Sequence, residues 1–223
     1  MDAIILAGGS GTRMNAGMNK VLMPLLGRPM VCYTLDAFEK SDCIDNIILV
    51  INEDDADFYS DFRSRYTKLS EIVHGGATRR DSSYIGIQKS TSKYIMIHDA
   101  ARALISTEDI KKASEAVEDN VAVTLGVACV DTMKMCDADG FVTASVDRSA
   151  LYKVYTPQAF NRNKLIELHK NISPDLNITD DCSLFEINGL DVKIICGEAT
   201  NIKLTTPDDI GYAEYILSKR KNN

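Results

Sequence analysis

A run of apolar residues at 3–6 opens this chain and leads directly into a segment that contains Gly8, Gly9 and Gly11. Such a run is typical of a central parallel strand, and the loop at its carboxyl end lies where open α/β sheets bind their ligands. Because glycine adopts backbone angles that other residues avoid, several N–H groups of this loop can converge on phosphate oxygens. The opening residues therefore favour a parallel α/β fold with an anion-binding loop at one edge of the sheet.

Apolar runs then alternate with segments of helical periodicity. Strands are predicted at 3–6, 47–51, 71–73, 94–97 and 121–124, and helices at 29–39, 56–66, 79–89 and 107–117. This β-α-β-α order predicts an α/β fold with a Rossmann-like, mostly parallel sheet that carries helices on both faces.

Polar, strand-like residues begin near Gly126 and continue to about Tyr155, with a turn signal at 137–140. This pattern favours an antiparallel hairpin, and its few apolar residues give it little core of its own. We therefore expect a protruding β-arm at about 130–155 that rests on another surface. Beyond the arm, the sequence predicts helices at 162–170, 180–188 and 207–219, a strand at 192–196, and Thr206 as the cap of the last helix.

The length of 223 residues suits one large domain, so we expect residues 1–223 to form a single unit with the arm as a subregion. Hydrophobic residues make up 45% and charged residues 26%, and no apolar run is long enough to cross a membrane. We therefore expect a soluble protein without a membrane partner. A net charge of −7 argues against nucleic acid as a partner, because duplex binding needs a basic face.

The six cysteines show no C-x-x-C spacing, and no signal-like apolar stretch follows a basic N-terminal region. Structural zinc and secretion are therefore not indicated. We expect reduced thiols in a cytoplasmic protein.

Two cations, Arg13 and Lys20, follow the first predicted strand and can bring positive charge to phosphates held by the glycine loop. The dinucleotide fingerprint G-x-G-x-x-G does not fit, because Met14 stands where its last glycine belongs, and the Gly-Lys-Ser/Thr run of a P-loop does not occur. From these residues alone, an ordinary strand-to-helix turn with solvated cations remains the alternative to a polyphosphate loop.

Asp99 follows the predicted strand at 94–97 and is expected at the carboxyl edge of the sheet, beside the glycine loop. A carboxylate there suits a magnesium ion that also contacts substrate phosphates, whereas the alternative is a side chain that only caps the next turn. His98 is expected to be a packed histidine without a catalytic role.

Two further segments carry candidate binding residues. A glycine pair ending at Gly76 precedes a helix start with Thr78 and Ser82, which either binds the base or ribose of a nucleotide or forms a plain N-cap. Lys203 lies just before the last predicted helix, where it is either a binding group or a solvent-facing lysine.

Taken in order, these segments resemble the 2-C-methyl-D-erythritol 4-phosphate cytidylyltransferase family over nearly the whole chain. Their joint occurrence is far more specific than any one of them. The likeness rests on AGGSGTRM with Lys20, GGATRRDSS, HDAAR, VDTMK, DRSALYKVYTPQAF, TDDCSLFE and NIKLTTPDD. The resemblance implies a nucleotidyltransferase-type fold, transfer of CMP from CTP to a small polyol phosphate, a requirement for magnesium, and a homodimer with exchanged arms.

The resemblance also implies roles for single residues. The cations implied on the reacting phosphates, as the catalytic set, are Arg13, Lys20 and Lys203. The nucleotide-binding candidates are Ala7, Gly8, Gly9, Gly11, Gly76 and Ser82. The candidates for binding the phosphorylated acceptor are Asp99, Arg102, Thr132, Arg148 and Thr156. Asp99 is implied in addition as the magnesium ligand, and the arm of a neighbouring subunit is implied to supply Arg148 and Thr156.

Four departures from the family concern its motifs. The chain reads Ala-Gly-Gly at 7–9 where the family usually has Ala-Ala-Gly, Asn-Lys-Val at 19–21 for Pro-Lys-Gln, Ala103 for proline and Tyr152 for tryptophan. Because Ala-Gly-Gly also occurs in relatives such as ribitol 5-phosphate cytidylyltransferase, that activity is the alternative. Segments 98–102 and 179–183 are more similar to the methylerythritol enzyme, which we therefore expect.

Alternatives from other classes are a module that binds CTP without turning it over and a nicotinamide-dependent dehydrogenase. Lys20 and Asp99 argue against the binding module, because both belong to the expected reaction chemistry. The failed dinucleotide fingerprint argues against the dehydrogenase.

Overall fold

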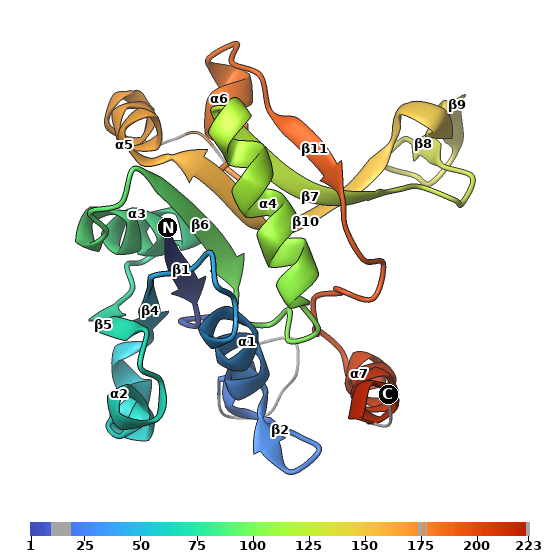
Figure 1. The fold of residues 1–223 in the computed structure, drawn as a ribbon. Coiled ribbons are helices and arrows are strands. Elements are labelled where there is room, and N and C mark those ends of the chain that lie inside the picture. Colours follow the sequence, from blue (N-terminus) through green and yellow to red (C-terminus); the bar gives the residue numbers. More distant parts are fainter. Residues whose placement is uncertain (10–18, 174–175, 177, 222–223) are drawn as a thin grey trace.

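In the computed structural model, which describes residues 1–9, 19–173, 176 and 178–221, a seven-stranded sheet forms the centre of the molecule (Figure 1). Its strands lie in the order β11-β7-β10-β6-β1-β4-β5. Their bounds are β1 (Asp2–Leu6), β4 (Asn46–Ile51), β5 (Leu69–His74), β6 (Tyr94–Asp99), β7 (Ala122–Ala128), β10 (Tyr152–Asn161) and β11 (Lys193–Cys196). Neighbouring strands are parallel except at β10, which is antiparallel to both β6 and β7, so the mostly parallel sheet is confirmed.

Helices cover both faces of the sheet (Figure 1). α1 (Met30–Glu39) and α4 (Thr107–Asp119) pack on one face, and α3 (Arg79–Lys89), α5 (Arg162–Asn171) and α6 (Ser183–Ile187) pack on the other. Strand β1 shows why two separate cores form. Ala3 and Ile5 are buried in the core with α1 and α4, whereas Ile4 is buried in the core with α3 and α5, because successive side chains of a strand point to opposite faces.

The remaining elements of the described part of the chain are short, except for the C-terminal helix. They are η2 (Lys20–Leu22), β2 (Pro24–Leu25), β3 (Arg28–Pro29), η3 (Glu53–Tyr59), α2 (Phe62–Arg65), β8 (Lys134–Cys136), β9 (Val142–Ser145), η4 (Arg148–Ala150) and the C-terminal α7 (Pro207–Lys221). No helix among the described residues is long and apolar enough to cross a membrane. The predicted cap of α7 is confirmed, because Thr206 and Asp209 exchange side-chain-to-backbone hydrogen bonds of 3.4 and 2.8 Å.

The single helix predicted at 56–66 is wrong. The structure has the 3₁₀ helix η3 followed by one turn of α-helix, α2. The hydroxyls of Ser60 and Ser64 donate to the carbonyls of Asp57 and Asp61, three residues earlier, at 2.8 and 2.6 Å. Such local side-chain bonds compete with a continuous helical ladder, which explains the break.

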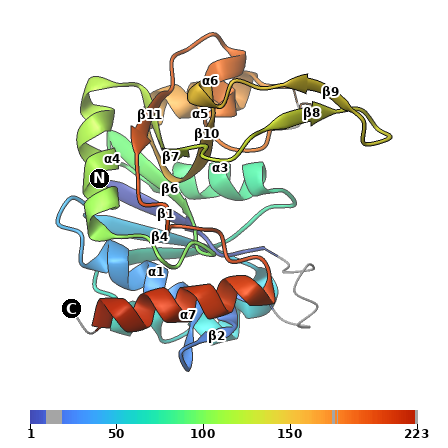
Figure 2. The same ribbon diagram turned by 90° about the vertical axis from the view of Figure 1, so that its right-hand side faces the viewer.

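The hairpin predicted after Gly126 is confirmed by the antiparallel pair β8 and β9. Its turn follows the predicted signal, because the Gly140 N–H donates to the carbonyl of Asp137 and Gly140 has a φ of +88°, which favours glycine. Figure 2 shows this arm, with β8 and β9, extending away from the central sheet.

Strand β10 was not predicted. It runs through the middle of the sheet, yet its sequence contains Pro157, which argues against a central strand because proline cannot donate to the ladder. The structure accommodates the proline at an irregularity, since the register with β7 shifts between Tyr155 and Gln158.

Candidate active site

Strands β1 and β6 lie side by side and end together, so that Leu6 is the register partner of Asp99. The backbone N–H of Ala100 donates to the carbonyl of Leu6 at 3.0 Å. The segment that begins at Ala7 therefore leaves the sheet directly beside Asp99. The predicted position of Asp99, at the carboxyl edge next to the glycine segment, is confirmed.

The carboxylate of Asp99 is contacted by two cations. Lys203 Nζ lies 2.7 Å from its Oδ2, and Arg79 Nε and Nη2 each lie 3.3 Å from its Oδ1. Burial alone would raise the pKa of Asp99, but Arg79 and Lys203 hold it well below its usual range. Asp99 therefore stays ionised, and the alternative that it only caps the next turn does not describe its contacts.

Arg79 also reaches a second carboxylate, that of Asp181, with Nη1 at 2.7 Å from Oδ2. Burial alone would lower the pKa of Arg79, but Asp181 and Asp99 raise it above its usual value, so the guanidinium stays charged. Arg79 is the first residue of α3, whose N-terminus is fixed by a reciprocal capping box between Thr78 and Asp81. The local fold thus aims Arg79 across the edge of the sheet.

Thr156 binds this cluster from β10. Its Oγ1 accepts a hydrogen bond from the backbone N–H of Asp99 at 3.0 Å and lies 3.1 Å from His98 Nδ1. The expectation that a neighbouring subunit supplies Thr156 is wrong, because Thr156 is buried in its own sheet. β10 begins at Tyr152, at the base of the arm, and Thr156 lies in the part of β10 that is within the sheet. Thr156 therefore belongs to the site of its own chain.

His98 is fully buried, and its Nε2 lies 3.3 Å from the carbonyl of Arg102. Burial lowers the pKa of His98 to about 3, so the ring is neutral. This geometry confirms a packed histidine that orients its neighbours through hydrogen bonds.

Arg102 lies against Asn201 and Tyr155. Its Nη1 donates to the carbonyl of Asn201 at 3.1 Å, and its guanidinium lies 5.5 Å from the centre of the Tyr155 ring. The side chain of Asn201 in turn donates to the carbonyl of Thr156 at 2.9 Å. Among the residues that the structure describes, the buried Arg102 Nε and Asn201 Oδ1 have no hydrogen-bond partner, so these two polar atoms near Asp99 can each accept or donate a further hydrogen bond.

The glycine segment after β1 is anchored on both sides. The N–H of Ala7 donates to the carbonyl of Val50 at 2.7 Å, and Asn19 Nδ2 donates to the carbonyl of Ala7 at 2.6 Å. A Cβ added at Gly8 would lie 3.3 Å from the backbone of Ile51, so the close approach favours glycine. Gly9 follows at the exposed surface.

Lys20 is brought to this edge by its neighbour Asn19, which also donates to Asp55 Oδ2 at 2.7 Å. Lys20 itself is half-buried at the start of η2. Its role as a catalytic cation stays a prediction. Two other candidates, Gly11 and Arg13, lie outside the described residues.

Gly76 and Ser82 contact each other at the start of α3. The N–H of Gly76 donates to Ser82 Oγ at 3.1 Å, while Thr78 forms the N-cap of the helix. The plain N-cap considered for this segment is therefore present. The proposed part of Gly76 and Ser82 in binding a nucleotide stays a prediction.

Thr132 and Arg148 lie on or next to the arm, and the structure does not bring them to Asp99. Both are exposed, and Arg148 Nη1 donates to the carbonyl of Val130 at 2.6 Å. Figure 2 shows the arm extending beyond the central sheet of its own chain. Thr132 and Arg148 could therefore bind a substrate only at a surface that the arm itself contacts.

The described residues contain no group of three or more His, Cys, Asp or Glu side chains arranged to hold a metal ion. Asp99 offers one ionised carboxylate, and both of its oxygens contact cations of the protein. This donor set fits a magnesium ion only if most of its oxygen ligands come from a bound polyphosphate, which is common for magnesium.

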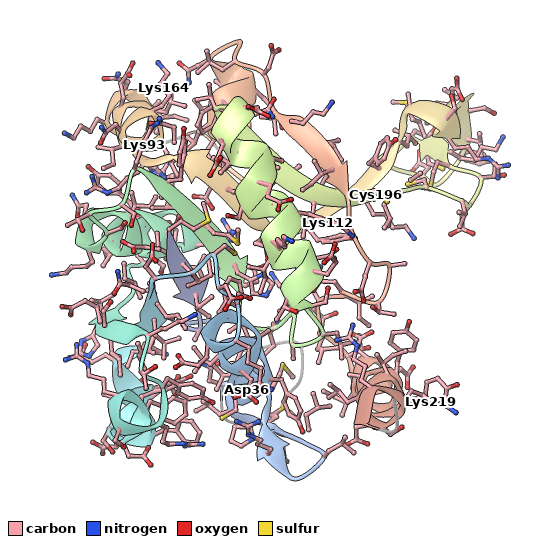
Figure 3. The ribbon with its side chains drawn as sticks, in the orientation of Figure 1. Asp36, Lys93, Lys112, Lys164, Cys196 and Lys219 are labelled. Atoms are coloured by element: carbon pink, nitrogen blue, oxygen red, sulfur yellow. The ribbon has the colours of Figure 1, made fainter. Side chains whose placement is uncertain are left out.

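A shallow hollow of about 410 Å³ lies elsewhere, between α4 and β11. Lys112 and Cys196, both labelled in Figure 3, are among its lining residues. None of the candidate residues named above lines it, so it is separate from the Asp99 cluster.

Sequence reasoning assigned no role to Asn19, which holds the glycine segment, nor to three residues around Asp99, namely Arg79, Asp181 and Asn201. Arg79 lies in the motif GGATRRDSS and Asp181 lies in TDDCSLFE. Along the chain, however, Arg79 is 20 residues from Asp99 and 102 residues from Asp181. The available signal was a charged residue immediately after a predicted N-cap at the carboxyl edge of the sheet, which identifies Arg79 and none of the others. Chemically, one carboxylate surrounded by Arg79, Lys203 and Arg102 suits an anionic ligand with several phosphates.

The comparisons with known proteins agree with one another. Residues 1–219 match the family described as 2-C-methyl-D-erythritol 4-phosphate cytidylyltransferase. The enzyme of that name from Clostridium beijerinckii is 39% identical over 221 residues, covering 97% of this chain and 98% of the relative, and the one from Geobacillus kaustophilus is 38% identical, covering 98% and 97%. The crystal structure of 4-diphosphocytidyl-2C-methyl-D-erythritol synthase from Anaerococcus prevotii superposes with a TM-score of 0.86 at 34% identity, covering 97% of both chains.

Proposed function

The chain belongs to the 2-C-methyl-D-erythritol 4-phosphate cytidylyltransferase family, and we propose that the Asp99 cluster is where it transfers CMP from CTP to 2-C-methyl-D-erythritol 4-phosphate. The chain is thus a CTP-dependent nucleotidyltransferase of isoprenoid precursor biosynthesis. The observation that carries the placement of the site is the register of β1 and β6, which puts the segment beginning at Ala7 next to Asp99 and its cations.

The reaction that this site supports needs positioned charge and no general base. The phosphate monoester of the acceptor has a second pKa near 6, so it is largely a dianion at neutral pH and can attack directly. Its oxygen forms a bond to the α-phosphorus of CTP, and the bond from that phosphorus to the β-phosphate oxygen breaks to release pyrophosphate. The difficulty is the approach of two anions, which is overcome by orientation and by neutralising charge.

Lys203 and Lys20, together with Arg13, are the cations that we assign to the phosphates of CTP. Lys203 is well placed for this role, because its side chain is 36% exposed while its amine is held at Asp99. The half-buried Lys20 is carried to the same edge by the Asn19 contacts. Preorganised cations of this kind stabilise charge on the transferring phosphoryl group without reorganisation during the reaction.

Magnesium is the metal cofactor that we propose, with Asp99 as the protein ligand. When bound, the ion would neutralise negative charge on the phosphates of the nucleotide. The support is the ionised carboxylate at the carboxyl edge of the sheet; the remaining ligands would come from the triphosphate.

We further propose a homodimer in which the arm of each subunit reaches the site of the other. The arm exposes apolar side chains, with Val130 75%, Phe141 72% and Val142 61% exposed, which is the composition of a surface that packs on a partner. In this arrangement Thr132 and Arg148 act on the neighbouring site, and arginine suits bidentate capture of the acceptor phosphate. A cytoplasmic location is proposed as well, supported by six cysteines that are all free thiols.

The function is tested by measuring pyrophosphate release from CTP with methylerythritol phosphate and, in parallel, with ribitol 5-phosphate. We expect turnover with the first acceptor and at least about 100-fold lower kcat/KM with the second, since loss of matched polar contacts rejects an analogue strongly. Preference for ribitol 5-phosphate would overturn the acceptor but keep the reaction class. Binding of CTP without pyrophosphate release with either acceptor would overturn both.

A further inference from the structure

Asp181 is a buried carboxylate that lies behind the site rather than in it. Its residue is 1% exposed, its Oδ1 accepts a hydrogen bond from Ser83 Oγ at 2.6 Å, and its backbone N–H donates to Gln158 Oε1 at 3.3 Å. His169 Nε2 is 3.6 Å from Oδ1, beyond hydrogen-bond distance. A buried carboxylate needs a compensating cation, and within the described part of the chain the guanidinium of Arg79 contacts Asp181 most closely, with Nη1 2.7 Å from Oδ2.

The guanidinium of Arg79 spans the gap between Asp181 and Asp99. Its Nη1 contacts Asp181 at 2.7 Å, while Nε and Nη2 both point at Oδ1 of Asp99 from 3.3 Å. The guanidinium is planar and rigid, so fixing one edge of it fixes the direction of the other. The shorter contact lies on the buried side, which makes Asp181 the anchor and Asp99 the group that is oriented.

The two oxygens of Asp99 consequently have different surroundings. Oδ1 faces Arg79, which is tied to the buried Asp181, and Oδ2 faces the amine of Lys203. Lysine carries a compact charge on a flexible stem, and the Lys203 side chain is 36% exposed, whereas that of Asp181 is 2% exposed. One side of Asp99 is therefore fixed, and the other is open toward ligands.

We propose that Asp181 is a positioning residue for the nucleotidyl transfer: through Arg79 it holds one oxygen of Asp99, so that Asp99 keeps its orientation while Lys203 is shared with the incoming phosphates. Asp181 itself contacts no substrate. The inference rests on the proposed function, since it assigns to Asp181 a part in that reaction. It predicts a defect in the chemical step that is larger than any defect in substrate binding.

The test compares Asp181→Ala with the matched control Asp2→Ala. Asp2 is an equally buried carboxylate, 2% exposed, which accepts hydrogen bonds from Ser90 and Asn46 at the opposite end of β1. We expect Asp181→Ala to lower kcat about tenfold or more while the KM of each substrate changes less than about threefold, and Asp2→Ala to keep kcat within about twofold of the parent. Equal kcat losses in both variants would show that burial of a carboxylate matters and its position does not, which overturns the proposal.

Two additions keep the result decisive. Arg79→Lys retains the charge but cannot span both carboxylates, so it should reproduce the kcat loss even if Asp181→Ala does not fold, and the double variant should lose little more than either single one. Solvent exchange of the Arg79 Nε proton, measured by nuclear magnetic resonance without any substrate, should become at least about tenfold faster in Asp181→Ala and stay unchanged in Asp2→Ala. Unchanged exchange would overturn the inference, whereas absence of turnover in the unaltered protein would overturn the proposed function instead.

Discussion

Lys203 Nζ lies 2.7 Å from Oδ2 of Asp99, although 104 residues separate them along the chain. The backbone N–H of Leu204 donates to the carbonyl of Ala101 at 2.8 Å, which fixes the segment before α7 against the residues that follow β6. This contact brings two distant segments of the site together at one edge of the sheet. Each charged side chain of the site can therefore be replaced singly without disrupting a helix or a strand.

Replacing Lys20 with alanine should lower kcat about 100-fold or more with the fold intact, because it removes a charge aimed at the transition state, comparable to about 3 kcal/mol. The measurement is pyrophosphate release together with circular dichroism. Lys111→Ala, on the exposed face of α4, is the control and should retain full turnover. A folded Lys20→Ala protein with near-normal turnover would contradict the assignment of this cation.

Asp99→Asn should lose activity and magnesium dependence together, because the ionised carboxylate is the group proposed to hold the ion. Turnover is measured over a magnesium titration in both proteins. Asp2→Asn serves as the control and should keep the magnesium response of the unaltered protein. Full activity of the unaltered protein in excess chelator would refute the metal requirement.

Mixing two inactive proteins, Lys20→Ala and Arg148→Ala, should restore activity after subunit exchange. Random exchange makes half of the dimers mixed, and each has one intact site of two, so about a quarter of full activity is expected. The structure adds a control: Thr156 belongs to the site of its own chain, so a mixture of Lys20→Ala and Thr156→Val should show no such gain. Absence of recovery despite confirmed mixed dimers would exclude the shared site.

Asp181→Asn should destabilise the fold by about 2 to 3 kcal/mol at pH 7, because the charged Arg79 loses its shorter contact and keeps only Asp99. Burial would raise the pKa of Asp181, but Arg79 holds it lowered in the folded state from an ordinary value of 3.8. The ionised carboxylate therefore stabilises the fold fully above about pH 4, and this contribution is lost as the pH falls through the folded-state pKa.

The stability difference between Asp181→Asn and the unaltered protein should accordingly narrow at acid pH. Urea unfolding at a series of pH values from 7 to 3 measures it. A difference that widens toward acid pH would contradict the lowered pKa.

Gly86→Ala tests how closely α3 packs on the sheet. An added Cβ would lie 2.4 Å from Ile4 Cγ2, so we expect a loss of about 1 to 3 kcal/mol from overpacking. Gly211→Ala in α7 meets nothing within 4 Å and should instead stabilise the protein by up to about 1 kcal/mol through helix propensity. Thermal unfolding of both variants measures the contrast, and a neutral Gly86→Ala would show that α3 can shift away from Ile4.

The sequence predicted the parts of the fold that depend on local pattern. The strand at 94–97 and the helix at 79–89 each follow from the pattern of neighbouring residues in a short stretch of sequence. The structure has β6 and α3 at these positions. Asp99 could be placed at the sheet edge for the same reason, because it directly follows an apolar run. β10 was missed because Pro157 is a local signal against a strand, and only its neighbours on both sides make the strand possible.

The partners of Asp99 could not be predicted in the same way. Nothing in the spacing of Arg79, Asp181 and Lys203 shows that they meet, since the sheet and its helices bring them together from three separate segments. The assignment of Thr156 to a neighbouring subunit was wrong for a related reason. The residue stands close to the arm in sequence, but β10 carries it into the interior.

Strand β10 has one end at the base of the arm, at Tyr152, and passes Thr156 four positions later. Side chains alternate between the two faces of a strand, so sliding β10 by a single residue against β6 would turn Thr156 away from the backbone of Asp99. The same slide would also retract or advance the arm by one step of about 3.4 Å. The register of β10 therefore sets two features at once, namely how far the arm extends from the sheet and whether Thr156 stays hydrogen-bonded to Asp99.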